Sequence, residues 1–418
     1  MGFRTIFTTL FLSLQALVYF TFIRYWKTTK YYKPSHRWWA LAPFVIFNLS
    51  FILVSFIWGR DFAPPEWFKI VGLYPFYIWM AATFFISVWL LVGKVIKLPF
   101  QIPIWIVKIF KPLRQKIKSL KEKKAVKTVD HSRRKFVRYA TMGISTYAFA
   151  GATYGMLRHD SYVIDHKTIT IANLPPELRG TTITLISDIH AGQYMDEKEM
   201  REYADVINSL ECDIVCIPGD FVNFEAKDVH MLTNAFRDLK AKHGVYGSLG
   251  NHDFFQDVDY VAKAIVNESP VQLLRNDHRS IDINGKKLFM MGVDDTRGSG
   301  LNMETVLNYY TGLDAKLKQS DPEFNSAPKI LLCHKPYGFD ALAEKEIDLI
   351  LSGHTHGGQV VPIKFGTFNM SFAATVSKYI EGIYKIGKSN MYVSRGIGSV
   401  GLPIRLNCPP EITKITLA

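Results

Sequence analysis

The sequence of 418 residues contains only four cysteines, and no two of them stand in a Cys-x-x-Cys spacing. All four lie in apolar or strand-like surroundings, at positions Cys212, Cys216, Cys333 and Cys408. Buried free thiols are therefore the expected state, and a disulfide framework or a thiolate metal site is disfavoured. The sequence also lacks internal repeats and low-complexity segments, so it does not predict a repeat protein.

Strongly polar residues are scarce in three runs within the first 92 residues: 3–23, 38–58 and 68–92. Gln15 is an exception inside the first run, and Asn48 is one inside the second. Each run holds about 20 residues or more, enough for a helix to cross a hydrocarbon core of about 30 Å. Tryptophans crowd the ends of the runs, as is usual at the level of the lipid headgroups. Residues 1–110 are therefore predicted to form a transmembrane region whose partner is the lipid bilayer.

Acidic residues are scarce in residues 111–138, where two of them oppose twelve basic residues. Most of the net charge of +13 lies in this stretch. A nucleic-acid-binding protein usually spreads its basic residues over a folded face, so no nucleic-acid partner is expected. Beside apolar runs, the stretch instead predicts a basic cytoplasmic linker that flanks the membrane.

The end of this linker, residues 132–136 (Ser-Arg-Arg-Lys-Phe), resembles a twin-arginine export signal. Its internal position and the three preceding runs depart from that pattern, and a basic membrane flank is the alternative interpretation. Either interpretation makes the uncharged residues 139–157 a fourth span. The loop charges place the first and third loops in the cytoplasm and everything after Arg158 outside it. A cytoplasmic location of residues 158–418 is the alternative topology.

Residues 158–418 are long enough for one α/β domain with a sizeable core. Short apolar strand candidates alternate there with amphipathic helical patterns, at residues 200–210 and 229–240. The strand candidates are residues 181–187, 213–218, 245–249, 287–292, 329–333, 348–352 and 391–393. This alternation is typical of a layered α/β fold rather than an all-β fold.

Five of the strand candidates end in residues that can bind metals. The clusters are Asp188-x-His190, Gly219-Asp220, Gly250-Asn251-His252-Asp253, His334 and Gly353-His354-Thr355-His356. Each cluster alone is more typical of a turn or a capping residue. Because ligands gather at the carboxyl ends of strands in α/β sheets, the five clusters together indicate one shared site. Histidines two residues apart, as in the last cluster, can face different sides and bind two metals.

This ordered set of motifs resembles the calcineurin-like metallophosphoesterase superfamily, over about residues 160–418. Residues 394–398 (Ser-Arg-Gly-Ile-Gly) and 401–405 (Gly-Leu-Pro-Ile-Arg) are similar to its bacterial membrane-associated branch. The resemblance implies an α/β fold in which a layered β-sandwich is flanked by helices. The apolar runs add an all-α transmembrane region of about four helices before it.

The resemblance also implies two divalent metal ions as cofactors, and the mixed ligand set suits manganese, zinc or iron. One metal ion would be held by Asp188, His190, Asp220 and His356. The other would be held by Asp220, Asn251, His334 and His354. Asp220 would thus bridge the two ions.

The same resemblance implies that His252 is a catalytic residue, as an acid or as a stabiliser of the leaving oxygen. Asp253 is a candidate to orient a neighbouring group. Arg395 and Arg405 are candidates to grip phosphate because a guanidinium offers two parallel donors, and surface arginines in loops are the alternative. Residues 294–295 (Asp-Asp) either line the same site or are solvated loop carboxylates.

The expected function is hydrolysis of phosphodiester, pyrophosphate or phosphomonoester bonds by a membrane-anchored enzyme with two metal ions. Lipid-linked or envelope phosphates are the expected substrates because the chain is expected to lie at a membrane. The expected location is the cell membrane, as a multi-pass protein with an extracytoplasmic catalytic domain. The alternatives are a phosphodiesterase that acts on soluble or nucleotide substrates, and a non-catalytic membrane sensor or scaffold.

Overall fold

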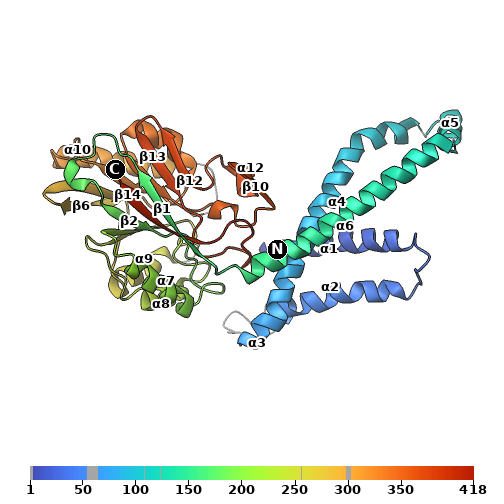
Figure 1. The fold of residues 1–418 in the computed structure, drawn as a ribbon, viewed down its shortest axis with the longest axis horizontal. Coiled ribbons are helices and arrows are strands. Elements are labelled where there is room, and N and C mark those ends of the chain that lie inside the picture. Colours follow the sequence, from blue (N-terminus) through green and yellow to red (C-terminus); the bar gives the residue numbers. More distant parts are fainter. Residues whose placement is uncertain (1–2, 54–64, 108, 123, 256, 298–302) are drawn as a thin grey trace. The chain divides into compact units, whose positions relative to one another are not determined.

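The computed structural model describes residues 3–53, 65–107, 109–122, 124–255, 257–297 and 303–418. The chain divides into two compact units, Met1–Met156 and Leu157–Ala418 (Figure 1). The described secondary structure of the first unit is helical, and the second unit contains the described strands.

The first unit is built from long helices that are rich in apolar residues. Its elements are α1 (Phe3–Trp26), α2 (His36–Ile52), α3 (Glu66–Phe68), the π-helical turn η2 (Lys69–Leu73), α4 (Tyr74–Val107), α5 (Lys111–Glu122) and α6 (Lys124–Leu157). Helices α1, α2 and α4 pack against one another. Many of their large apolar side chains nevertheless stay exposed, including Phe20 on α1 and Ile46 on α2.

Gln15 on α1 and Asn48 on α2, two of the polar residues within the apolar runs, bond to each other. Gln15 Nε2 donates to Asn48 Oδ1 at 3.1 Å, and Asn48 Nδ2 donates to Gln15 Oε1 at 2.8 Å. The indole of Trp79 on α4 donates to the same Gln15 oxygen at 3.3 Å. A buried amide needs partners inside the protein, so this network selects the helix faces that meet.

One helix in the described part of the chain, Glu66–Val107, is long and apolar enough to cross a membrane. It combines α3, η2 and α4 and contains the predicted span 68–92. The expected region of about four spans is therefore not confirmed, and the other three spans stay predictions. The end of the second predicted span, including Trp58, lies outside the described residues.

The basic stretch 111–138 is helical where it is described. Helix α5 covers its first half, and α6 continues without a break through residues 139–157. Residues 124–142 contain neither proline nor glycine, so no residue there interrupts the helix. Arg133 and Arg134 of the twin-arginine-like motif both pair with Asp130 one turn earlier, at 2.7 and 2.5 Å.

The second unit contains two six-stranded sheets. In spatial order, the first sheet is β1 (Val163–Ile169), β14 (Glu411–Leu417), β2 (Thr182–Leu185), β3 (Ile214–Pro218), β4 (Val245–Ser248) and β5 (Val271–Leu273). The second sheet is β12 (Gly382–Ile386), β13 (Ser389–Val393), β9 (Leu349–Ser352), β8 (Lys329–Leu332), β7 (Lys286–Gly292) and β6 (Asp277–Ile283). Strands β2 to β5 run parallel to one another, and so do β13, β9, β8 and β7.

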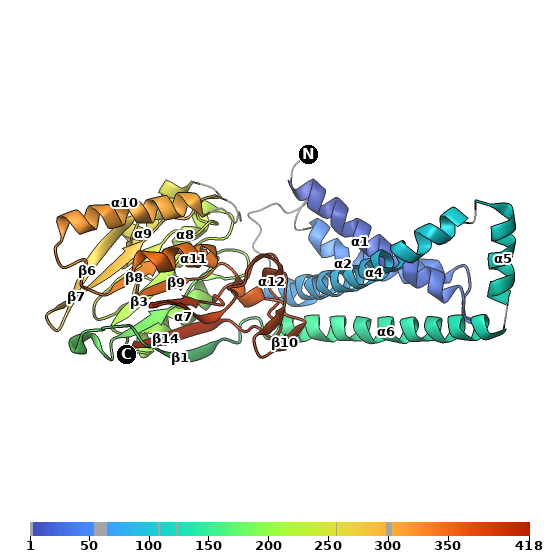
Figure 2. The same ribbon diagram turned by 90° about the horizontal axis from the view of Figure 1, so that it is seen from above.

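The two sheets pack face to face, and helices cover both outer faces (Figures 1 and 2). Apolar side chains of both sheets, such as Leu185 and Leu351, share one buried cluster. The first sheet is covered by α7 (Glu197–Ser209), α8 (Val229–Ala235) and α9 (Val258–Glu268). The second sheet is covered by α10 (Glu304–Ser320) and α11 (Phe339–Leu342). This arrangement confirms the predicted α/β sandwich flanked by helices.

Short elements complete the second unit and lie mostly in its loops. They are η3 (Pro176–Leu178), η4 (Ala226–Asp228), η5 (Pro336–Gly338), η6 (Ala343–Lys345), η7 (His356–Gly358), α12 (Ala373–Val376) and a hairpin of β10 (Ile363–Phe365) and β11 (Phe368–Met370). The central strands β3 and β9 are buried at every residue. Strands buried on both faces are continuously apolar, which is why they were recognisable in the sequence.

Candidate metal centre

Five loops that follow parallel strands of the two sheets carry the candidate metal ligands. Asp188 and His190 follow β2, Asp220 follows β3 and Asn251 follows β4. From the second sheet, His334 follows β8, and His354 and His356 follow β9. The strand ends of both sheets therefore meet at one edge of the sandwich, as expected for a site at the carboxyl ends of strands.

The described ligand atoms form two groups with no residue in common, and a third group, His190, Asp220 and His252, overlaps both. In one group, Asp188, His190 and His356 each place an atom within 4.8 Å of the others. The Nε2 atoms of His190 and His356 lie 3.0 Å apart, and Asp188 Oδ1 lies 3.5 Å from His356 Nε2. Asp220, His334 and His354 form the second group. All six residues belong to the ligand sets that the motif resemblance implies, and metal binding by them stays a prediction.

Asp220 lies between the two groups. Its Oδ2 atom is 3.1 Å from His334 Nε2 and 3.6 Å from His190 Nε2. Its other oxygen, Oδ1, accepts the backbone N–H of His252 at 2.8 Å. One carboxylate oxygen thus faces a ligand of each group, which is the position that a bridging ligand requires.

Five of the candidate ligands have a left-handed backbone. Asp188, His190, Asp220, His354 and His356 have φ between 50° and 72°. Residues other than glycine adopt this region rarely, and such strain persists only where the surrounding structure enforces it. Here the sharp turns at the strand ends direct the side chains of these residues into the shared site.

Two glycines allow the ligand loops to approach one another. A Cβ at Gly250 would collide with the carboxylate and backbone of Asp220, and one at Gly353 would collide with Ser187 and Asp188. These close approaches explain why both motifs place a glycine directly before the metal-binding residues.

The protonation of three of the four buried candidate imidazoles suits metal binding. Burial holds the pKa of His190, His354 and His356 well below the usual range, so each ring stays neutral and keeps a lone pair. His334 differs, because the attraction of Asp220 outweighs its burial and raises its pKa to about 10. Its Nδ1–H donates to the Pro218 carbonyl at 2.7 Å, which directs Nε2 toward Asp220.

The carboxylates of the two groups differ in their pKa values. Burial opposes ionisation of Asp220, but the facing His334 holds the pKa of Asp220 well below its usual range. Burial raises the pKa of Asp188 to about 6, and the negative charge of Asp220 adds to this rise. Two carboxylates and several imidazoles this close together are stable as a set when cations lie among them.

The residues present fit a pair of divalent cations. Asn251 is buried, and its Oδ1 atom has no hydrogen-bond partner within the described protein. An unpaired buried carbonyl is costly, and a cation would satisfy it. The donors are carboxylates, imidazoles and one amide, a mixture that manganese, zinc and iron accept.

His252 lies against the same cluster. Its Nδ1–H donates to the Asn223 carbonyl at 2.8 Å, so Nε2 is the nitrogen that is left for chemistry. The ring centroids of His252 and His190 lie 4.5 Å apart. A ring nitrogen of His252 is also within 4.8 Å of the ligand atoms of His190 and Asp220. The structure thus places His252 beside the candidate metal ligands, as the motif implies.

Asp253 binds backbone amides rather than another side chain. Its carboxylate accepts the N–H groups of Gly250, Asp220, Phe221 and Val222 at 2.9 to 3.1 Å. It is fully buried. The loop that carries Asp220 and the loop that carries Asn251 are therefore held together by one carboxylate.

Asp253→Asn is expected to lower the free energy of unfolding by about 3 kcal/mol, because an amide NH₂ would face backbone N–H groups that lose their acceptor. The melting temperature of the full chain in detergent, followed by calorimetry, measures this loss. Asp259→Asn is the matched control, since Asp259 is exposed and pairs with Arg275 at the surface. The control should change stability by less than about 0.5 kcal/mol. Equal melting temperatures for the two variants would contradict the role of Asp253.

The two candidate phosphate-binding arginines contact the protein itself. Arg395 Nη2 pairs with the buried Glu411 at 2.6 Å. Arg405 is buried, and its guanidinium donates to the carbonyls of Arg395, Gly396 and Gly398. Arg405 Nη2 also lies 3.4 Å from His356 Nδ1. A phosphate contact by either arginine stays a prediction, and of the two only Arg405 has a contact with His356 among those given above.

The two adjacent aspartates 294 and 295 are buried rather than solvated. Asp295 pairs with the buried Lys335 at 2.8 Å, and Asp294 accepts from Arg275 at 2.9 Å. Lys335 directly follows His334. The sequence did not predict its ion pair, because nothing in the local pattern around Lys335 indicates that Asp295 lies beside it. Tyr337 was also missed, although its ring packs edge-on against His354 with centroids 5.4 Å apart.

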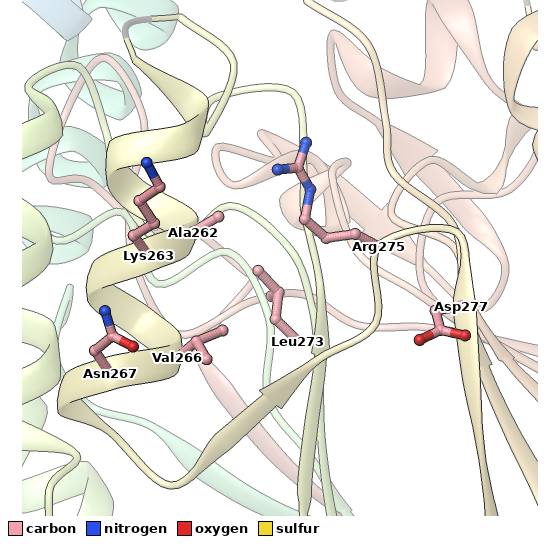
Figure 3. A pocket seen from close by; sticks show the side chains of 7 residues that line it. All are labelled: Ala262, Lys263, Val266, Asn267, Leu273, Arg275 and Asp277. Carbon is pink, nitrogen blue, oxygen red and sulfur yellow. The ribbon is translucent and has the colours of Figure 1, made fainter.

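A separate open hollow of about 310 Å³ lies between α9, β5 and β6 (Figure 3). Its lining residues are Ala262, Lys263, Val266, Asn267, Leu273, Arg275 and Asp277. None of these is a candidate metal ligand. The metal centre is therefore defined by its ligand geometry and not by this hollow.

A two-sheet α/β sandwich with histidines and carboxylates grouped at its strand ends is typical of proteins that bind two metal ions. The model of the calcineurin-like phosphoesterase family matches residues 181–358. An uncharacterized metallophosphoesterase from Aquifex aeolicus is 30% identical over 262 residues, which are 61% of this chain and 91% of that protein. The chain therefore belongs to the calcineurin-like phosphoesterase family.

A bovine relative (Bos taurus) carries the name "Transmembrane protein with metallophosphoesterase domain". It is 29% identical over 262 residues, which are 60% of this chain and 55% of that protein. The chain thus spans about half the length of this relative. A solved dimetal phosphatase from Danio rerio aligns with 11% identity and a TM-score of 0.34, over 52% of this chain and 88% of that one. We draw no conclusion from a structural similarity at this TM-score.

The predicted superfamily is confirmed by these matches. The matches do not distinguish the predicted bacterial membrane-associated branch from other branches of the superfamily, because the relatives come from animals as well as bacteria.

Proposed function

We propose that this protein is a membrane-anchored phosphoesterase that uses two divalent metal ions at the cluster around Asp220. The observation that carries the proposal is the position of Asp220, which groups with His334 and His354 and whose Oδ2 atom also lies 3.6 Å from His190 Nε2 of the other group. Bound divalent cations would acidify a water molecule and neutralise the phosphate oxygens. The substrate bond would be a phosphodiester, a pyrophosphate or a phosphomonoester.

His252 would hold the proton that the leaving oxygen requires. Its Nδ1–H is fixed on the Asn223 carbonyl, and its backbone N–H is fixed on Asp220. The ring packs against Phe255, with centroids 4.4 Å apart. The imidazole therefore has little freedom to turn, and Nε2 is the nitrogen able to deliver a proton toward the ligand groups.

Membrane attachment is supported by the helix Glu66–Val107 and by the name of the bovine relative. An anchored enzyme meets substrates at the membrane most often, so we propose lipid-linked or envelope phosphates as its substrates. We further propose a multi-pass location with the catalytic unit outside the cytoplasm, which the basic stretch 111–138 supports. A reporter fused after Ala418 tests this orientation, and a cytoplasmic signal would contradict it.

Hydrolysis by the full chain in vesicles should be measured on a lipid phosphate, a lipid pyrophosphate, a nucleotide diester and an aryl phosphodiester. We expect turnover that disappears with a chelator and returns with Mn²⁺ or Zn²⁺. Preference for the two lipids supports the proposed substrates. Equal turnover of soluble diesters by residues 158–418 alone would favour the soluble-substrate alternative. Metal binding without turnover of any substrate would favour the sensor or scaffold.

A further inference from the structure

The hairpin β10–β11 exposes the apolar side chains of both its strands on one face. The strands pair Ile363 with Met370 and Phe365 with Phe368. Residues paired across an antiparallel ladder, and those two apart on one strand, share a face. Their exposed fractions are 52% for Ile363, 84% for Phe365, 59% for Phe368 and 53% for Met370.

The opposite face of the hairpin is polar and is attached to the domain. It carries the remaining pair, Lys364 and Asn369. Lys364 pairs with Glu381 at 2.5 Å, and Asn369 Nδ2 donates to the Gly357 carbonyl at 3.0 Å. The hairpin is therefore inverted relative to a usual surface hairpin, which buries its apolar face and presents its polar face to water.

The exposed apolar face continues into the following helix. Phe372, just before α12, is 82% exposed, and Val376 within α12 is 40% exposed. We call the six side chains together the apolar hairpin surface: Ile363, Phe365, Phe368, Met370, Phe372 and Val376. A group of exposed aromatic and aliphatic side chains of this kind marks an interaction site.

The surroundings of the apolar hairpin surface favour a lipid bilayer over a protein partner. Residues 360–380 contain no aspartate or glutamate. The neighbouring carboxylates of Glu381 and Asp340 are paired with Lys364 and Lys378, so their repulsion of anionic headgroups is reduced. A stable protein interface takes about 20 to 30 residues from each side, far more than six side chains. Shallow membrane insertion instead needs only a few aromatic and aliphatic side chains. The same chain also carries a helix that can cross a membrane.

We propose that the apolar hairpin surface inserts into the interfacial layer of a lipid bilayer. The hairpin bonds to Gly357, and the preceding residue is the candidate ligand His356. Insertion would therefore hold the loop of the metal centre close to the headgroup phosphates. The position of the hairpin does not depend on which phosphoester is hydrolysed.

The test uses single cysteines in the full chain, reconstituted into vesicles and labelled with an environment-sensitive fluorophore. Phe365→Cys and Phe372→Cys report on the hairpin. Val266→Cys on α9 is the matched control, because Val266 is an apolar residue that is 55% exposed. The four native cysteines are buried, so the reagent should select the introduced thiols. The native protein measures any remaining background labelling.

Brominated lipids should quench the labels at 365 and 372 by about half and leave the label at 266 unchanged, since inserted groups lie about 5–10 Å into the interface. Equal quenching at all three positions would overturn the proposal, and so would no quenching at 365 and 372. Energy transfer between labelled chains at 365 without lipid quenching would also overturn it, by assigning the surface to a second copy. Because the test measures no hydrolysis, its failure is distinguishable from loss of the proposed activity.

Discussion

Asp220→Asn is expected to remove metal binding and to lower hydrolysis by about 1,000-fold or more. Asp220 lies between the two ligand groups, at 3.1 Å from His334 Nε2 and 3.6 Å from His190 Nε2. The facing His334 keeps the pKa of Asp220 low, so this carboxylate supplies a full negative charge. An amide has the same shape but lacks that charge, and it presents an NH₂ group where a second lone pair is needed.

The matched control for this variant is Asp213→Asn, at the other end of the same strand. Asp213 precedes β3, and its carboxylate accepts the N–H and the hydroxyl of Thr182 at 2.8 Å. Metal content by plasma emission and hydrolysis of an aryl phosphodiester should stay near the native values in the control. Two bound metals and native turnover in Asp220→Asn would contradict the assignment of the bridging ligand.

His252→Ala is expected to keep both metals and to lower turnover by about 100- to 1,000-fold, as loss of a general acid does. The loss should be largest for substrates with a poor leaving group, such as alkyl phosphodiesters. Substrates with a nitrophenyl leaving group need no proton and should lose less. The comparison of the two substrate series with metal analysis therefore separates proton delivery from metal binding.

The geometry makes this a sharp test, because His252 also lies within ligand distance of His190 and Asp220. If His252 were a third metal ligand, its removal would lower the metal content and affect both substrate series equally. His230→Ala is the control, since His230 is a partly exposed histidine that pairs with Glu268 at 2.8 Å. Turnover by the control should equal that of the native protein.

The sequence predicted the central strands of both sheets and missed most of the outer ones. Strands β3 and β9 are continuously apolar because both of their faces are buried. Strand β14 was missed although it lies inside the first sheet, between β1 and β2. Its polar residues hide the strand in the sequence: Glu411 is buried against Arg395, and Thr413 bonds to the Tyr392 hydroxyl. Partners this far along the chain cannot be recognised from local periodicity.

The contacts of the second arginine, Arg405, were not predicted from the sequence either. In the sequence, a guanidinium near a metal motif suggests a phosphate ligand. In the fold, three backbone carbonyls accept its hydrogen bonds from inside the protein. Burial and the direction of a side chain depend on packing, so composition and spacing did not reveal this role.

The sequence by itself determined which residue types stand at the strand ends, because buried strands and glycine turns leave a local pattern. The order of the five clusters was enough to identify the family and to name the candidate ligands. The resemblance already implied a bridging position for Asp220, whereas the tertiary structure alone decided that Asp253 holds two loops together by their amides. It alone showed the outward apolar face of β10–β11. These features depend on distances between segments that are far apart in the chain, and such distances exist only once the sheets have packed.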